Sequence, residues 1–193
     1  LKGKKIALNK GSNVHYLLVR ALESAGLQYR DIQPVYLPPA DARAAFERGS
    51  VDAWVIWDPF FAAAEHQIGA RVIATGENLV SNHQFYLAAR PFAERNPAVI
   101  STLIGEIRDI GRWVEANPDQ ATEQVAPLLG LSREITRKAV IRQGYGARPI
   151  TPEVVRAQQR IADTFAELRL IPRKLVIQDA VWAAPKSIAQ YPE

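Results

Sequence analysis

The feature that most constrains the fold is a nearly continuous apolar run, VDAWVIW, at residues 51–57. Such a run is typical of a strand that is buried on both faces of a parallel sheet, where polar and apolar residues need not alternate. Shorter runs at 4–8 and 35–37 also have strand character, and a helical pattern separates each run from the next. Residues 1 to about 84 therefore predict an α/β unit with a parallel sheet.

Strand and helix signals alternate through this first part of the chain. The predicted strands are 4–8, 35–37, 51–57, 71–75 and 85–90. The predicted helices are 14–25, 42–48 and a third that begins at Asp58-Pro59. Asp41 is expected to cap the second helix, because its carboxylate can accept from a free N–H of the first turn. Pro59 suits a first helical turn, since its missing N–H has no partner there in any case.

Beyond Pro91 the pattern changes to helices alone. The predicted starts are Asn96-Pro97, Asn117-Pro118, Ser132 and Thr151-Pro152. The first of these helices repeats apolar residues from Ile100 to Val114 along one side, and the last carries Phe165 on its inward side. Helices of this kind must bury their apolar faces, so we expect them to need a partner surface.

Composition excludes several classes of function. The net charge is only +4, and no Lys/Arg cluster with interleaved aromatic residues is present, so nucleic acid is not the expected partner. The absence of cysteine removes disulfides, thiolate nucleophiles and sulfur-based zinc sites. No methionine occurs, and the start LKGKK is no signal peptide, so we expect the sequence to begin at an internal point of a longer product.

A glycine-containing turn, GSNVH at residues 11–15, opens the first predicted helix. This turn follows a strand of the parallel sheet, and ligands of such sheets bind outside the carboxyl ends of the strands. Ser12 and Asn13 offer a hydroxyl and an amide beside free backbone N–H groups, which would receive a sulfonate, phosphate or carboxylate. The alternative is that Ser12 or Asn13 is an ordinary N-cap, worth about 1 kcal/mol.

A second candidate lies where the run 51–57 ends. Trp57 and Asp58 follow another strand of the same sheet, so we expect them at the same edge as the GSN turn. The indole could form an apolar wall and the carboxylate could accept from a ligand. Alternatively, Asp58 only caps the following helix while Trp57 fills core.

The remaining signals do not indicate catalysis or a metal. His15, His66 and His83 lack the spacing of metal ligands, and no cofactor is expected. Of the three, only His15 is expected to face a cleft, while His66 is expected on the exposed surface of a helix. There is no GxSxG motif and no compact Asp/Glu/His cluster, so nothing in these residues indicates an enzyme, although they do not exclude one.

Five stretches together carry a resemblance that covers nearly the whole chain. They are KGKKIALNKGSNVHYLL, YLPPADARAAFERGSVDAWVIWDPF, NHQFYLAARPFAERNP, RQGYGARPITPEVV and LIPRKLVIQDAVW. This combination closely resembles the periplasmic aliphatic sulfonate-binding proteins of ABC importers, which group with taurine- and nitrate-type solute-binding proteins. The resemblance implies an α/β fold of the periplasmic binding protein type II class, with a ligand cleft between two lobes.

The resemblance also implies how the chain divides. Residues 1–84 would form most of the second α/β lobe, and residues 85–193 would be a return strand and helices of the first lobe. An N-terminal part of that first lobe is expected ahead of residue 1. A signal peptide is expected upstream of that part, with a periplasmic location and a monomeric intact protein.

The site implied by the resemblance combines both turns. Gly11, Ser12 and Asn13 would contact the sulfonate, with His15 beside them, and Trp57 and Asp58 would form the opposite wall. Asn82 and Gln84, near the hinge, would add contacts. The implied partners are a small sulfonate and the membrane permease, to which the closed, ligand-bound form delivers its solute unchanged.

Three alternatives stay open at this point. A transcription regulator uses the same two-lobed architecture for its effector domain, and it would carry a DNA-binding helix pair. A desulfinase-type enzyme would need a cysteine nucleophile, which these residues do not contain. A binding protein for taurine, nitrate or a pyrimidine precursor would differ only in its ligand.

Overall fold

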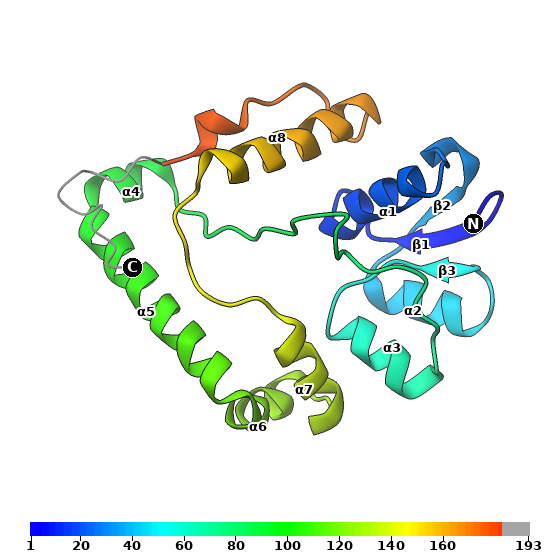
Figure 1. Cartoon of the computed structure of the whole chain (residues 1–193), viewed down its shortest axis with the longest axis horizontal. Helices are drawn as coiled ribbons and strands as arrows, with labels where there is room; N and C mark the ends of the chain where they lie inside the picture. Colours follow the sequence, from blue (N-terminus) through cyan, green and yellow to red (C-terminus); the bar gives the residue numbers. More distant parts are fainter. Residues whose placement is uncertain (183–193) are drawn as a thin grey trace. The chain divides into compact units, whose positions relative to one another are not determined.

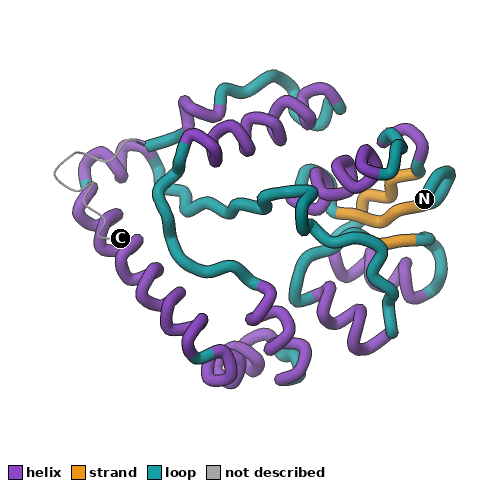
Figure 2. The backbone as a smooth tube through the Cα atoms, viewed as in Figure 1, coloured by secondary structure: helices purple, strands orange, loops and turns teal. Residues whose placement is uncertain are grey.

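The computed structural model describes residues 1–182 and divides the chain into two compact units (Figures 1 and 2). The first unit combines Leu1–Asn82 with Arg160–Lys174. The second comprises His83–Gln159 together with the chain from Leu175 on. The predicted boundary at residue 84 lies close to this division, whereas 160–174 pack with the first unit. The assignment of these units to the lobes of a cleft stays a prediction.

A small parallel sheet organises the first unit. It contains β1 (Lys5–Leu8), β2 (Gln33–Tyr36) and β3 (Ala53–Trp54) in the order β2-β1-β3. Ala7 of the central strand lies opposite Val35 on one side and Trp54 on the other. The expected parallel sheet is confirmed for these three strands.

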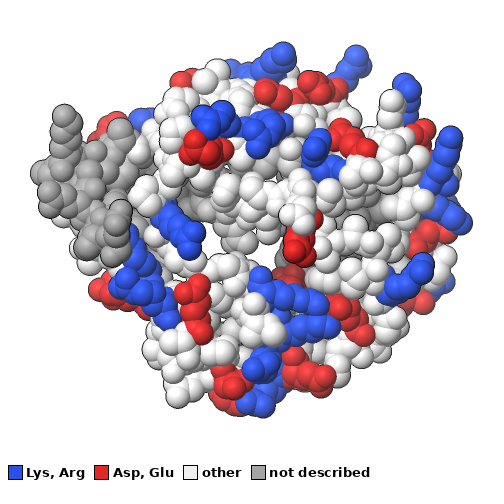
Figure 3. Space-filling model, in the orientation of Figure 1, with Lys and Arg blue, Asp and Glu red and all other residues white. Residues whose placement is uncertain are grey.

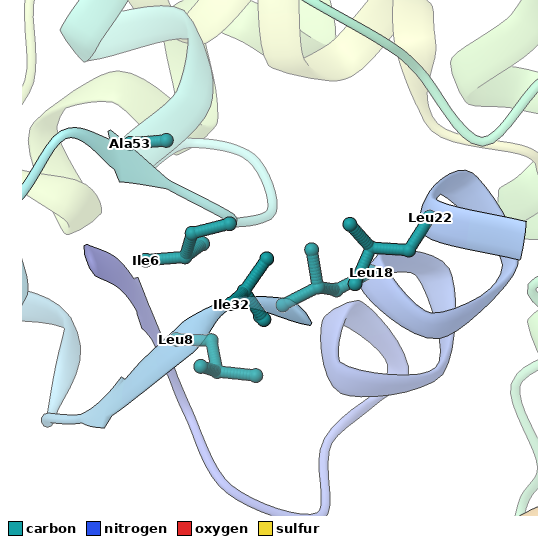
Figure 4. Packing of buried hydrophobic residues seen from close by; sticks show 6 residues of the cluster. All are labelled: Ile6, Leu8, Leu18, Leu22, Ile32 and Ala53. Atoms are coloured by element: carbon teal, nitrogen blue, oxygen red, sulfur yellow. The ribbon is translucent and has the colours of Figure 1, made fainter. Parts of the chain in front are cut away.

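Helices cover both faces of this sheet, because successive residues of β1 point to opposite sides. Ile6 and Leu8 pack with Leu18 and Leu22 of α1 (Asn13–Ser24), as Figure 4 shows from close by. On the other face, Ala7 packs with Ala42 and Ala45 of α2 (Pro39–Glu47). Figure 1 shows α1 on one side of the strands, and α2 and α3 (Phe60–Ile68) on the other. The first unit is therefore a three-layer α/β/α arrangement.

Two predictions for the first unit need correction in detail. The apolar run 51–57 contributes only Ala53–Trp54 as a strand, with one further ladder bond from Val55 N–H to the Ala7 carbonyl at 2.9 Å. The last residues of this run no longer belong to the sheet, because β1 ends and offers them no partner. They are half-buried. Helix α2 begins at Pro39, so Asp41 lies in its first turn and is not its cap.

The predicted strands 71–75 and 85–90 are wrong. Residues 69–89 form neither helix nor strand and are drawn as loop in Figure 2. Their apolar side chains are largely exposed, with 62% for Ile73 and 92% for Leu87. A strand needs a neighbour to pair its N–H and C=O groups, and no strand in residues 1–182 pairs with these segments.

The second unit is helical, as predicted. It contains α4 (Arg90–Arg95), α5 (Pro97–Ala116), α6 (Pro118–Leu129), α7 (Arg133–Arg142) and the start of α8 (Pro152–Glu167). The predicted starts at Asn96, Asn117 and Ser132 are confirmed as N-caps. On α5, Leu103 and Ile110 of the predicted apolar face remain 52% and 61% exposed.

Two short 3-10 helices complete the secondary structure, Tyr29–Asp31 in the first unit and Ile177–Ala180 in the second. Among residues 1–182, no helix is both long and apolar enough to cross a bilayer.

Candidate functional site

The candidate site lies where the strands of the first unit end. The chain leaves β1 toward α1 on one face of the sheet, and it leaves the neighbouring β3 toward α3 on the other face (Figure 1). Neighbouring strands whose connections run to opposite sides mark the switch point of an open parallel sheet, where ligands bind. The segment after β1 contains Gly11, and the segment after β3 contains Trp57. Both predicted turns therefore belong to one edge of the sheet.

The turn after β1 is shaped by a glycine. Gly11 has φ +74°, a left-handed conformation that costs a side-chain-bearing residue energy but suits glycine. Ser12 is the N-cap of α1, and its carbonyl accepts from His15 N–H at 3.1 Å and from Tyr16 N–H at 3.4 Å. The chain thus enters the helix directly after the glycine.

Ser12 does not cap its helix with its side chain. Its hydroxyl instead donates to the Asn9 carbonyl at 2.7 Å. The backbone N–H groups of Ser12, Asn13 and Val14 also have no acceptor among the residues that the structure describes. These groups carry the positive end of the helix dipole. Ser12 is thus the N-cap by position, as the structural alternative has it, but its side chain does not cap the helix, so these donors remain available to an anion.

Asn13 and Asn82 are brought together from positions 69 residues apart. The Asn13 Nδ2 group donates to Asn82 Oδ1 at 3.0 Å, and both residues are exposed. Asn82 itself has φ +47°, a conformation that asparagine tolerates better than most residues. The side-chain amides of two predicted site residues thus lie at the same end of α1.

His15 does not face a cleft, which corrects the prediction. Its side chain is fully buried, and its Nδ1 accepts from Gly11 N–H at 3.0 Å. The ring centroid lies 5.2 Å from Tyr29, 5.8 Å from Tyr36 and 5.5 Å from Phe165. Burial, aided by the charge of Lys10, lowers the pKa of His15 to about 4. The ring is therefore neutral at ordinary pH and supports the turn from inside.

Sequence reasoning missed the cation beside this turn. The Lys10 Nζ lies 5.3 Å from the centroid of the Tyr36 ring, within the range of a cation–π contact. The Tyr36 hydroxyl is 3.1 Å from that of Tyr29, whose pKa is raised by burial and by this hydrogen bond. The only local signal was a lysine inside the turn. The tyrosines could be placed only through the parallel pairing of β1 with β2.

The turn after β3 is bonded into helix α3. Asp58 Oδ1 accepts from Ala62 N–H at 2.9 Å, and the Trp57 carbonyl accepts from Phe61 N–H at 3.0 Å. Both side chains are half-buried. Pro59 is the N-cap of α3, but the Asp58 carboxylate bonds an N–H of its first turn, so the helix-supporting alternative holds for this side chain. A ligand contact from Trp57 or Asp58 stays a prediction.

The remaining candidate residues lie in the second unit or on α3. Gln84 is exposed and belongs to the second unit, as does His83, whose ring is 6.5 Å from that of Phe85. His66 is exposed in the last turn of α3, as expected. Within residues 1–182, no group of three or more His, Asp or Glu side chains could hold a metal ion.

The positive charge at the candidate site comes from groups at the turn itself, and not from a large basic surface around it. On the face shown in Figure 3, lysine and arginine are interspersed with aspartate and glutamate. Several of these charges form exposed pairs within one helix, such as Arg20–Glu23 of α1. The attraction for an anion at the turn would therefore come from the N–H groups of α1 and from Lys10.

Comparison of the chain with known proteins identifies its family. Residues 2–130 match the model of the NMT1-like family. The chain belongs to this family. A relative in Escherichia coli (strain K12), assigned as an aliphatic sulfonates-binding protein, is 44% identical over 94% of this chain.

Solved structures agree with this assignment. The periplasmic aliphatic sulphonate binding protein SsuA from Escherichia coli matches all of this chain, with 41% identity and a TM-score of 0.91. The alkanesulfonate-binding protein SsuA from Xanthomonas axonopodis pv. citri, bound to MOPS, matches 94% of it, with 37% identity and a TM-score of 0.87. The predicted α/β fold of this NMT1-like chain is thereby confirmed.

The match covers only part of these proteins. The chain spans 57% of the length of the Escherichia coli relative and 63% of each of the two solved chains.

Proposed function

We propose that this chain belongs to the solute-binding component of an ABC importer, which captures aliphatic sulfonates in the periplasm for sulfur acquisition. The loaded protein delivers its solute to the membrane permease and breaks no bond. In this proposal the intact protein is a monomer, exported by a signal peptide. The similarity to sulfonate-binding proteins, at 44% and 41% identity, supports this reading over a regulatory domain.

The observation that carries the proposal is the open N-terminus of α1. Three consecutive N–H groups, from Ser12 to Val14, have no acceptor in the described chain, and the Ser12 hydroxyl makes no side-chain cap. A sulfonate offers three oxygen acceptors and a charge that no physiological pH removes. Neutral donors at a helix terminus match both properties, and they keep their strength at every pH at which the protein is folded.

The neighbouring groups have distinct parts in this proposal. Lys10 adds a full positive charge beside the turn. Asn82, bonded to Asn13, orients that side chain and offers its own amide, while a ligand contact from Gln84 stays a prediction. Trp57 forms the apolar wall for the alkyl part, while Asp58 meets the amine of an aminosulfonate.

Binding is coupled to delivery by closure of two lobes around the ligand. A solute that contacts both lobes stabilises the closed form by its extra contacts there, which shifts the population toward that form. The permease then recognises the closed form. In this proposal, some contacts of the other lobe come from the part of the relatives' length that this chain does not cover.

Calorimetric titration of the complete gene product tests the proposal. MOPS and short alkanesulfonates should bind, and they should bind more tightly than sulfate or nitrate. Binding of nitrate alone, or of no sulfonate, would contradict the assigned ligand class. A DNA-binding helix pair encoded upstream, in place of a signal peptide, would contradict the transport role.

A further inference from the structure

His15 contacts the turn from a position that leaves the donors of α1 open. It is the third residue of the helix, and in a capping box the side chain at this position accepts from the N–H of the N-cap residue. Here the acceptor is Nδ1, and the donor is Gly11 N–H, one residue earlier, at 3.0 Å. The N–H of the N-cap residue Ser12 is therefore spared.

We infer that His15 is a positioning residue, whose neutral ring holds Gly11 so that the turn presents its N–H groups to the sulfonate. This inference rests on the proposed function. His15 does not touch the ligand, since its side chain is fully buried. Its part is to hold the left-handed conformation of Gly11 before any ligand arrives, which lowers the cost of ordering the turn on binding.

The protonation state of His15 follows from its bonds. Because Nδ1 accepts from an N–H, the single ring proton of the neutral form sits on Nε2, which is buried and has no partner in the described chain. A second proton would have to go to Nδ1, and it would break the bond to Gly11. Protonation would thus release the turn.

The surroundings of the ring oppose that protonation. Tyr29 and Tyr36 contact it from the chain around β2, and Phe165 contacts it from α8. The charged group that acts on it is Lys10, which disfavours a second positive charge, and burial among these rings disfavours it further. Both causes lower the pKa of His15 to about 4. The unfolded chain takes up this proton near 6.5, so stability is lost as pH falls from that value toward about 4.

Two variants separate the hydrogen bond from the packing. In His15→Asn, the amide oxygen stands where the imidazole has Nδ1, so it can accept from Gly11 but cannot titrate. In His15→Phe, the aromatic volume is kept and the acceptor is lost. The complete gene product carries each change, and circular dichroism at each pH confirms that it is folded. MOPS is the probe at pH 7. In the pH series the probe is butanesulfonate, whose sulfonate stays ionised and which has no amine to gain a proton.

At pH 7, His15→Asn should bind MOPS within about threefold of the unmodified protein, and His15→Phe about tenfold more weakly. As pH falls toward 4, the unmodified protein should lose affinity more steeply than His15→Asn, which has no imidazole to protonate. The inference is overturned if His15→Phe binds as tightly as the unmodified protein, or if acid tightens binding.

Hydrogen exchange of the Gly11 amide keeps this inference separate from the proposed function. The amide should be protected in the unmodified protein and in His15→Asn, and it should exchange faster in His15→Phe. If no sulfonate binds the unmodified protein, the proposed function fails. Even then, the exchange rates decide whether His15 holds the turn. Equal rates in all three proteins would refute this role of His15.

Discussion

Two serines stand at the same position of two helices and use their hydroxyls differently. Ser132, the N-cap of α7, accepts from Ile135 N–H at 3.3 Å, which is ordinary capping. Ser12, the N-cap of α1, donates to the Asn9 carbonyl instead and leaves the first turn of its helix without a side-chain cap. Residue type and helix position are the same, so the difference must come from the surrounding structure.

The surroundings of α1 explain this difference. Gly11 turns the chain in a left-handed conformation, and His15 accepts its N–H. The Ser12 hydroxyl lies near the carbonyl of Asn9 and bonds to it. At α7 the serine hydroxyl bonds the first turn of its own helix. An uncapped helix end at the carboxyl edge of a parallel sheet is thus a feature of tertiary structure, and it is the one that suits an anion.

The largest effect should come from placing aspartate at each of the two serines. In Ser12→Asp, the carboxylate would take the open N–H groups and repel a sulfonate, at a cost of about 3 kcal/mol for like charges a few ångströms apart. Affinity for MOPS, measured by calorimetry, should fall by about a hundredfold. Ser132→Asp is the matched control and should leave both affinity and stability nearly unchanged, since aspartate caps as well as serine. Equal affinity for MOPS in the two variants would contradict the proposed difference between the open end of α1 and the capped end of α7.

Alanine at the same two positions should give opposite patterns. Ser132→Ala should lower the free energy of unfolding by about 1 kcal/mol and leave MOPS affinity unchanged, because it removes a cap distant in sequence from the turn. Ser12→Ala should weaken binding by about tenfold, through loss of the Asn9 hydrogen bond and of a ligand contact. Urea unfolding and calorimetry on both variants check this. A loss of affinity in Ser132→Ala would mean that the two helix ends are not independent.

Removal of Asn82 should have a smaller effect on the same end of α1. Asn82→Ala leaves the Asn13 side chain without the acceptor it now has at 3.0 Å. Because both side chains are exposed and can bond to water, affinity for MOPS should fall by only about threefold. Asn78→Ala, at another exposed asparagine with positive φ, serves as the control for backbone effects. An unchanged affinity in Asn82→Ala would exclude Asn82 from the site.

The smallest effect concerns the charges around the capped helix. Arg137 of α7 bonds Asp119 of α6 at 2.6 Å and lowers the pKa of that carboxyl below its ordinary 3.8. This stabilisation is present above the ordinary pKa and is lost as pH falls through the lowered one. In Arg137→Ala, the pKa of Asp119, followed by NMR titration, should rise toward 3.8. Because the pair is exposed and screened by salt, sulfonate affinity should not change, and a change would show coupling between the helix ends.

Local sequence patterns sufficed for most of the helices, although α4 was not predicted and α2 begins before the expected cap, Asp41. The starts at Asn96, Asn117 and Ser132 follow from capping and proline chemistry, which involve only neighbouring residues. The three paired strands were also predictable, since their apolar runs alternate with helical patterns. The turn at Gly11 was identified for the same reason, as a strand end followed by a helix start.

The failures have a common physical cause, which is dependence on distant partners. An apolar run becomes a strand only when another strand pairs with it, and 71–75 and 85–90 have no such neighbour in the described chain. The burial of His15 required Phe165, which lies 150 positions further along the chain.

By itself, therefore, the sequence determined which segments are helical and where an anion-receiving turn could form, because turns, caps and periodicity act over a few residues. Only the tertiary structure decided that the Ser12 hydroxyl turns away from its helix and that His15 supports the turn from inside. Burial and hydrogen-bond partners are set by residues that meet only once the chain has folded.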